Sequence, residues 1–360
     1  MSLRNSSLLL AFCVVVTPLV VAVPATAQST NGRWVMPRTS NGHPDLQGNW
    51  SNATMTPIQR RRGQDSAVLA LDEAKRGEQA KADRYTARAQ PSDPNRSAPP
   101  VGGDGSTGGA GNVGGYNSFY IDSGDNYAVF NGEIRTSLIV DPPSGRYPER
   151  TEASRERRAE RTRAIRAAGG RGGQYDNPEN RPLAERCLKS FGSNMGPPML
   201  PNYFYNNNYT IVQTADHVMI MTEMVHDTRV IRLGEPKPLP ANLQPWFGDS
   251  WGHWQGDTLV VETTNFHPTQ RRGGIISGTS EKLKVTERFT RADENTLNYE
   301  FTIEDPETFT RPFSGEVPFK GLPEQVFEYA CHEGNYALGN ILSGARYEER
   351  QAGRNQPEQR

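Results

Sequence analysis

A carboxylate on an apolar strand face is the first candidate for chemistry in this sequence. In residues 282–290 the apolar side chains Leu283, Val285 and Phe289 alternate with polar ones, and Glu287 falls on the apolar face. Side chains two positions apart in a strand share a face, so this alternation predicts that Glu287 lies in the interior. An interior carboxylate is costly unless it is paired or used. We therefore expect a lined cavity in which Glu287 transfers protons.

A second group of reactive side chains surrounds a predicted hairpin turn. Glu223 lies near the end of a predicted strand, His226 and Asp227 form the turn, and Arg229 begins the next strand. An imidazole beside a carboxylate suits acid–base catalysis near neutral pH. We predict that Glu223, His226, Asp227 and Glu287 are catalytic, and that Arg229 binds a ligand carboxylate through two hydrogen bonds. The alternative for the turn is a salt-bridged hairpin without a catalytic role.

Polar and aromatic side chains also gather in residues 328–336, next to Cys331. This density predicts either the lining of a site or a chain end that is fixed by a disulfide. The residues predicted to bind substrate are Arg229, His253, Tyr299, Glu328, His332 and Tyr336.

Two catalytic or cofactor motifs occur in the wrong setting. Residues 109–114 match the dinucleotide fingerprint, but a Pro- and Gly-rich loop precedes them where a strand is needed. Residues 248–252 match the nucleophile elbow of hydrolases, but they lie in a predicted turn and not between a strand and a helix.

The histidines lack the spacing of metal ligands, although a fold could bring three of them together. We therefore expect no cofactor and no metal. Besides His43, the histidines are His217, His226, His253, His267 and His332.

The predicted elements that position these side chains are mainly short antiparallel strands. Asn131-Gly132 joins a hairpin of residues 127–130 and 134–140, and further strands are predicted over 209–214, 218–225, 229–233, 258–265, 282–289, 296–304 and 325–331. About nine sequential strands favour an up-and-down antiparallel barrel, which has no exposed edges and is wide enough for one small ligand. The alternative is an open sandwich.

The predicted barrel domain spans residues 116–345, with a helical and Gly-rich insertion at about 146–200. An extended and helical N-terminal region with a Gly-rich loop (28–115) precedes it, and a disordered tail (346–360) follows. Residues 43–50 are expected to lay Leu46 and Trp50 onto the barrel, and residues 66–90 to form a helix.

The N-terminus has the pattern of a secretory signal peptide. A basic start at Arg4, an apolar stretch and the cleavage pattern Ala25-Thr26-Ala27 predict removal of residues 1–27 and a periplasmic or secreted protein. Losing Arg4 takes the formal charge from −1 to −2, which predicts no nucleic-acid partner, and we expect no membrane insertion of the mature chain. Cys187 and Cys331 remain in the mature chain and are predicted to form a disulfide.

Several stretches of the chain resemble an uncharacterised family of exported proteins from proteobacteria and acidobacteria. That family has no settled activity, so the resemblance assigns no role to any residue. The strand pattern is also similar to lipocalin-like barrels, some of which are lyases or hydratases of hydrophobic or aromatic small molecules. The stretches are His43–Gly48, Thr136–Pro143, Glu185–Leu188, Gly196–Pro201, Asn206–Thr214, Glu223–Asp227, Gly256–Phe266, Glu287–Arg291 and Tyr329–Leu338.

Three functions follow from these patterns. The first is an enzyme of lyase, hydratase or decarboxylase type, without a redox cofactor, that acts on a hydrophobic or aromatic compound in a barrel cavity. The second is a periplasmic carrier that uses the same cavity without turnover. The third is a structural, envelope-associated protein whose interior is filled by its own side chains.

Overall fold

The computed structural model describes residues 34–88, 95, 97, 121–167 and 173–354. The predicted signal peptide (1–27) and the glycine motif at 109–114 lie outside the described residues. The helices and strands all belong to one compact unit, Met36–Arg360.

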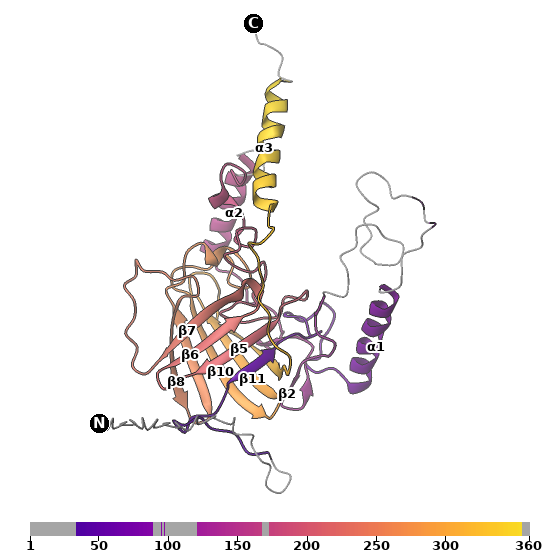
Figure 1. Ribbon diagram of the computed structural model, residues 1–360, viewed down its shortest axis with the longest axis vertical. Coiled ribbons are helices and arrows are strands. Elements are labelled where there is room, and N and C mark those ends of the chain that lie inside the picture. Colours follow the sequence, from indigo (N-terminus) through magenta and orange to yellow (C-terminus); the bar gives the residue numbers. More distant parts are fainter. Residues whose placement is uncertain (1–33, 89–94, 96, 98–120, 168–172, 355–360) are drawn as a thin grey trace, which may run out of the picture. The chain divides into compact units, whose positions relative to one another are not determined.

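Nine strands close into a barrel (Figure 1), which confirms a mainly β fold and excludes the open sandwich. The ring closes because β1 pairs with both β5 and the end of β12, and β4 (Ile139–Asp141) pairs with the beginning of β12 at Ser314 and Gly315. The barrel strands are β1 (Gly48–Ser51), β5 (Asn208–Gln213), β6 (His217–Thr222), β7 (Asp227–Leu233), β8 (Asp249–Gln255), β9 (Thr258–Thr264), β10 (Lys284–Asp293), β11 (Thr296–Glu304) and β12 (Phe313–Gly321).

The barrel is not purely antiparallel, which corrects the up-and-down prediction. β7 and β8 are parallel neighbours, in register at Arg232–Trp251 and Leu233–Gly252. The link between them, residues 234–248, contains four prolines. Proline has no backbone N–H for a sheet, so this segment forms no strand and carries the chain back to the end of the barrel where β7 began.

Three barrel strands were not predicted as strands, and one predicted strand does not form. β1 falls in the stretch that was expected to be an extended docking segment. β8 was interpreted as a turn, and β12 was missed because it contains Gly315 and Pro318, which are typical of strand interruptions. Residues 325–331 form no strand. The hairpin at Asn131-Gly132 forms with positive φ at both residues, but β2 (Val129–Phe130) and β3 (Glu133–Ile134) make a separate two-stranded sheet.

Large side chains fill the barrel interior. Tyr299, Phe319, Val317 and Val261 point inward and are 0% exposed. A side chain with no exposed surface has no water-sized space beside it, so the barrel leaves no open cavity around these residues. Leu46 and Trp50 are buried in the same core, as the sequence predicts.

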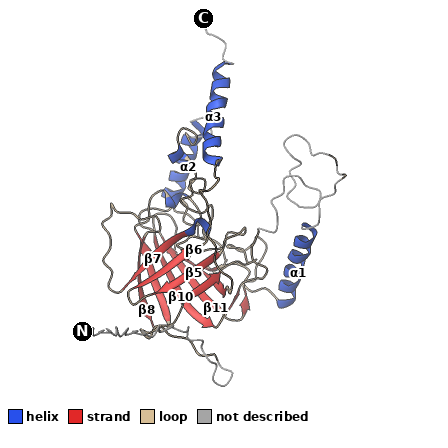
Figure 2. Ribbon diagram, viewed as in Figure 1, coloured by secondary structure: helices blue, strands red, loops and turns tan. Residues whose placement is uncertain are grey.

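Three helices accompany the barrel (Figure 2), namely α1 (Leu71–Arg88), α2 (Glu152–Ala167) and α3 (Ala337–Arg354). α3 extends into the segment that was predicted to be a disordered tail. Among the described residues, no helix is long and apolar enough to cross a membrane.

A loop segment covers one end of the barrel, and we call residues 187–202 the plug. Met195, Met199 and Leu200 are at most 1% exposed, and the last two belong to the barrel core. The predicted disulfide is confirmed, because Cys187 at the start of the plug bonds to Cys331. The plug therefore contributes side chains to the barrel core and is fixed covalently to the C-terminal part of the chain.

Candidate functional site

Glu287 lies in the interior, where alternation along β10 places it, and it has a charged partner. Arg229 on β7 donates hydrogen bonds of 2.6 and 3.1 Å to the two carboxylate oxygens. The Arg229 side chain is 3% exposed and that of Glu287 is 0% exposed. The two hydrogen bonds of Arg229 that were predicted to bind a ligand carboxylate are therefore made to the carboxylate of Glu287.

Tyr299 joins this ion pair to the plug. Its hydroxyl donates to Oε1 of Glu287 at 2.8 Å and accepts a hydrogen bond from the backbone N–H of Met199 at 2.9 Å. Burial, together with the Glu287 carboxylate, raises the pKa of Tyr299 well above its usual range. Tyr299 therefore holds its proton at neutral pH and acts as a fixed donor beneath the plug.

Lys189 is the charged residue of this site that the sequence interpretation missed. Its Nζ donates to the Gly196 carbonyl at 3.1 Å and lies 5.5 Å from the centre of the Phe247 ring. Among the described residues, no carboxylate oxygen lies within 4 Å of this amine. Burial, helped by the positive charge of Arg229 and opposed by Asp227, lowers the pKa of Lys189 to about 7.

Several buried polar atoms near the plug have no hydrogen-bond partner within the described protein. They include Arg229 Nε, Asn194 Oδ1 and Gln270 Oε1. The other end of the Gln270 amide, Nε2, donates to the Gly196 carbonyl at 3.4 Å, which is the same carbonyl that accepts from Lys189. Buried polar atoms of this kind are usually satisfied by water or by a ligand. We call this set of residues, with Lys189, Glu287 and Tyr299, the polar layer.

The turn between β6 and β7 is conformationally strained. Val225 and His226 have φ values of 67° and 55°, in the left-handed region that β-branched residues rarely adopt. Glu223 is buried and accepts a hydrogen bond from Asn208 Nδ2 at 2.8 Å, whereas His226 and Asp227 are exposed. Such strain costs about 1–3 kcal/mol and concentrates at functional sites.

The other predicted site residues lie on the surface. His253 is exposed on the outward face of β8, and Glu328, His332 and Tyr336 are exposed in the segment before α3. Asn335 of that segment donates a hydrogen bond to Cys187 Sγ at 3.4 Å. The structure thus brings Arg229, Glu287 and Tyr299 into direct contact and leaves these four outside the polar layer.

One feature of the sequence distinguishes Lys189, which is its position two residues after Cys187. A disulfide-fixed segment constrains its neighbours, but a single lysine in a loop is normally solvated. Only the covering of the barrel by residues 187–202, which depends on contacts distant in sequence, buries the amine.

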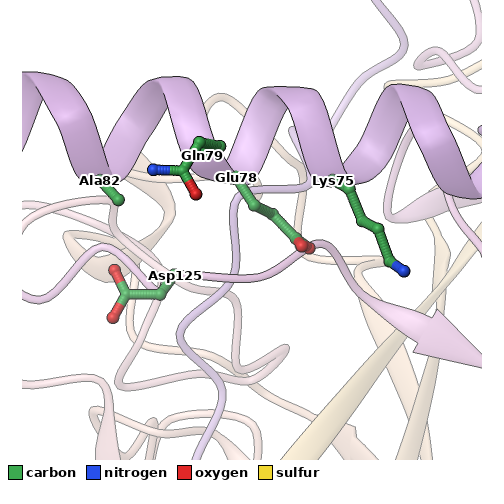
Figure 3. Close-up of a pocket in the computed structure, with 5 residues that line it drawn as sticks. All are labelled: Lys75, Glu78, Gln79, Ala82 and Asp125. Carbon is green, nitrogen blue, oxygen red and sulfur yellow. The ribbon is translucent and has the colours of Figure 1, made fainter.

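A hollow of about 480 Å³ lies beside α1 (Figure 3). Four of its five lining residues are polar or charged, and the Asp125 side chain in it is 91% exposed. We therefore do not assign a site to this hollow, which is lined by Lys75, Glu78, Gln79, Ala82 and Asp125.

Within the described part of the chain, no group of three or more His, Cys, Asp or Glu side chains could hold a metal ion. No protein-family model matches the chain, and no curated protein matches it. The family resemblance noted from the sequence therefore stays a prediction.

The buried amine predicts a pH dependence of stability. Unfolded Lys189 keeps its proton up to the ordinary pKa of 10.5, whereas the folded residue loses it near 7. Between these values the unfolded state binds more protons, so stability should rise by about 1.4 kcal/mol per pH unit from this residue. Urea unfolding of the wild type and of Lys189→Met at pH 7, 8 and 9 measures this change in the free energy of unfolding with pH.

The difference between the two proteins isolates Lys189 from other titrating groups. We expect Lys189→Met to be more stable than the wild type at pH 7 and the two free energies to converge as the pH rises. Parallel curves would show that Lys189 is charged throughout this range.

Proposed function

We propose that this protein is an exported enzyme that performs acid–base chemistry of lyase, hydratase or decarboxylase type on a hydrophobic or aromatic small molecule. Lys189 is the proton-transferring group, and the reaction takes place where the plug meets the barrel. The observation that carries the proposal is a buried amine that has no carboxylate partner among the described residues and that feels the positive charge of Arg229.

The chemistry of Lys189 supports this assignment. A general base works best when its pKa lies near the working pH, and burial brings a lysine into that range. When it is protonated, the buried amine lowers the stability of the folded protein. Functional groups are often retained in proteins despite such a loss of stability. Arg229 and Glu287 satisfy each other, so we propose that they do not exchange protons themselves and that the charge of Arg229 favours the neutral amine of Lys189.

The exposed surface of the plug supports a hydrophobic or aromatic substrate. Phe191, two residues after Lys189, packs edge-on against Phe204 and Tyr205 at ring-centre distances of 5.7 and 6.2 Å. Phe191 and Phe204 are each 51% exposed, and adjacent exposed aromatic rings are typical of ligand-binding surfaces. The disulfide Cys187–Cys331 is consistent with an oxidising compartment and so supports export.

The test is turnover of a panel of aromatic and aliphatic hydroxy acids, keto acids and unsaturated acids, followed by mass spectrometry. Lys189→Met should lower the rate at least about 100-fold, because it removes the proton-transferring group. Lys282→Met is the control, since Lys282 is exposed, and it should keep the wild-type rate. Equal rates in a folded Lys189→Met protein would contradict the assignment.

A structural role is the second candidate, and the filled barrel interior favours it. In that case Lys189→Met would be folded and more stable than the wild type. No compound of the panel would be turned over, and native mass spectrometry would detect no co-purified small molecule.

A further inference from the structure

We propose that Lys189 is a nucleophile that forms an imine with an aldehyde or ketone group of the substrate. This inference rests on the function proposed above and narrows its substrate class to carbonyl compounds. The distinction from simple proton transfer is a covalent bond between Nζ and a substrate carbon.

Lys189 differs from the other six lysines of the chain, all of which are described. Lys81 and Lys284 form ion pairs with Asp125 and with Glu262 and Glu304, respectively. Lys320 donates to Thr296, and the remaining three are exposed. Lys189 alone is buried, with a carbonyl oxygen in place of a carboxylate as its hydrogen-bond acceptor. The three exposed lysines without a named partner above are Lys75, Lys237 and Lys282.

The surroundings favour the unprotonated amine, which is the nucleophilic form. Phe247 and the apolar plug side chains remove water from Nζ, and the Arg229 guanidinium disfavours a second positive charge nearby. Desolvation and a neighbouring cation are the two means by which proteins activate lysine for imine formation.

Polar atoms of the same layer are available for the carbonyl oxygen. Arg229 Nε is a buried N–H donor without an acceptor, and Gln270 Oε1 is a buried acceptor without a donor. The first can stabilise a developing oxyanion, and the second can accept a hydrogen bond from the hydroxyl of the addition product.

Lys189 is also the least buried ionisable residue of the polar layer. It keeps 9% of its surface exposed, as does Phe247, whereas Glu287 and Tyr299 are fully buried. A carbonyl compound that approaches from solvent would therefore meet Lys189 before the Arg229–Glu287 pair.

The reaction balances without an oxidant or a reductant. Nζ attacks the carbonyl carbon, a C–N bond forms, and a proton passes from nitrogen to oxygen to give a carbinolamine. The C–O bond then breaks, and the oxygen leaves as water with one further proton from solvent. The product is a protonated imine, which withdraws electrons from an adjacent C–H or C–carboxylate bond.

The experiment is reductive trapping on the full protein with benzaldehyde and acetophenone as probes at pH 7. Sodium cyanoborohydride reduces the imine to a stable amine, and peptide mapping by mass spectrometry locates the label. We expect Lys189 to be labelled at least 10-fold more than any other lysine. Lys282→Met should keep this label, and Lys189→Met should lose it.

Two further results keep the outcome clear. If Lys189→Met fails to fold, labelling of the wild type from pH 6 to 9 serves instead, and Lys189 should reach half of its maximum at lower pH than Lys282. Labelling spread evenly over the lysines overturns the proposal. Turnover that depends on Lys189 without any adduct rejects the imine and leaves acid–base catalysis. An adduct without turnover of any compound supports the imine and rejects the enzyme.

Discussion

Glu287→Leu should lower the free energy of unfolding by about 3–5 kcal/mol, because it leaves the guanidinium of Arg229 buried without a counter-charge. Arg229 is 3% exposed and both of its terminal nitrogens bond to Glu287, so no solvent is available to replace the carboxylate. Arg229→Met should cost a similar amount by leaving the carboxylate unpaired. Chemical denaturation measures both changes.

The double variant Arg229→Met/Glu287→Leu separates the cost of an unpaired charge from the value of the pair. The double variant should lose less free energy of unfolding than the two single variants together, by about 2 kcal/mol or more, because neither charge then remains buried. Glu262→Leu is the control, because Glu262 faces outward and is half-exposed, and it should change stability by at most about 0.5 kcal/mol. Single variants that each cost under about 1 kcal/mol would contradict the account.

Removing the disulfide should cost about 4–5 kcal/mol. Cys187 and Cys331 are 144 positions apart, and a cross-link of that length removes much of the entropy of the unfolded chain. The variant Cys187→Ser/Cys331→Ser should unfold at the same denaturant concentration as the reduced wild type. Reductant should leave the variant unchanged, which serves as the control.

The same variant should release the segment that carries Glu328, His332 and Tyr336. Most of this segment is exposed, and the disulfide and the Asn335 contact tie it to the plug. Hydrogen exchange should therefore increase across residues 325–336 while β10 and β11 stay protected. Equal exchange in both proteins would show that other contacts hold the segment.

The sequence predicts the barrel best where alternation is regular. β11 has the predicted bounds, and alternation around Glu287 correctly places a carboxylate among Val285 and Phe289. β12 could not be found in this way, because Gly315 lies inward against the Phe301 ring and Pro318 interrupts the donor pattern. Both residues are explained by their neighbours across the sheet and not by the residues beside them in sequence.

The candidate site was predictable only in part, for the same reason. Glu287 is on an interior face by local pattern, but its partner Arg229 is 58 positions away on another strand. Lys189 gains its environment from the plug, Phe247 and Arg229 together, and none of these contacts is local. Local periodicity therefore identifies which side chains face inward, while long-range packing decides what they do there.

The number of strands in the barrel has a consequence of parity. In a closed ring, strands can alternate in direction throughout only when their number is even, so a ring of nine must contain at least one pair that runs the same way. The mismatch lies between β7 and β8, where only two residue pairs are in register. This seam follows from arithmetic and cannot be removed by substitution, only by gaining or losing a strand. Arg229 lies on β7, three residues before the first of these pairs, so the parallel seam involves the strand that carries half of the buried ion pair.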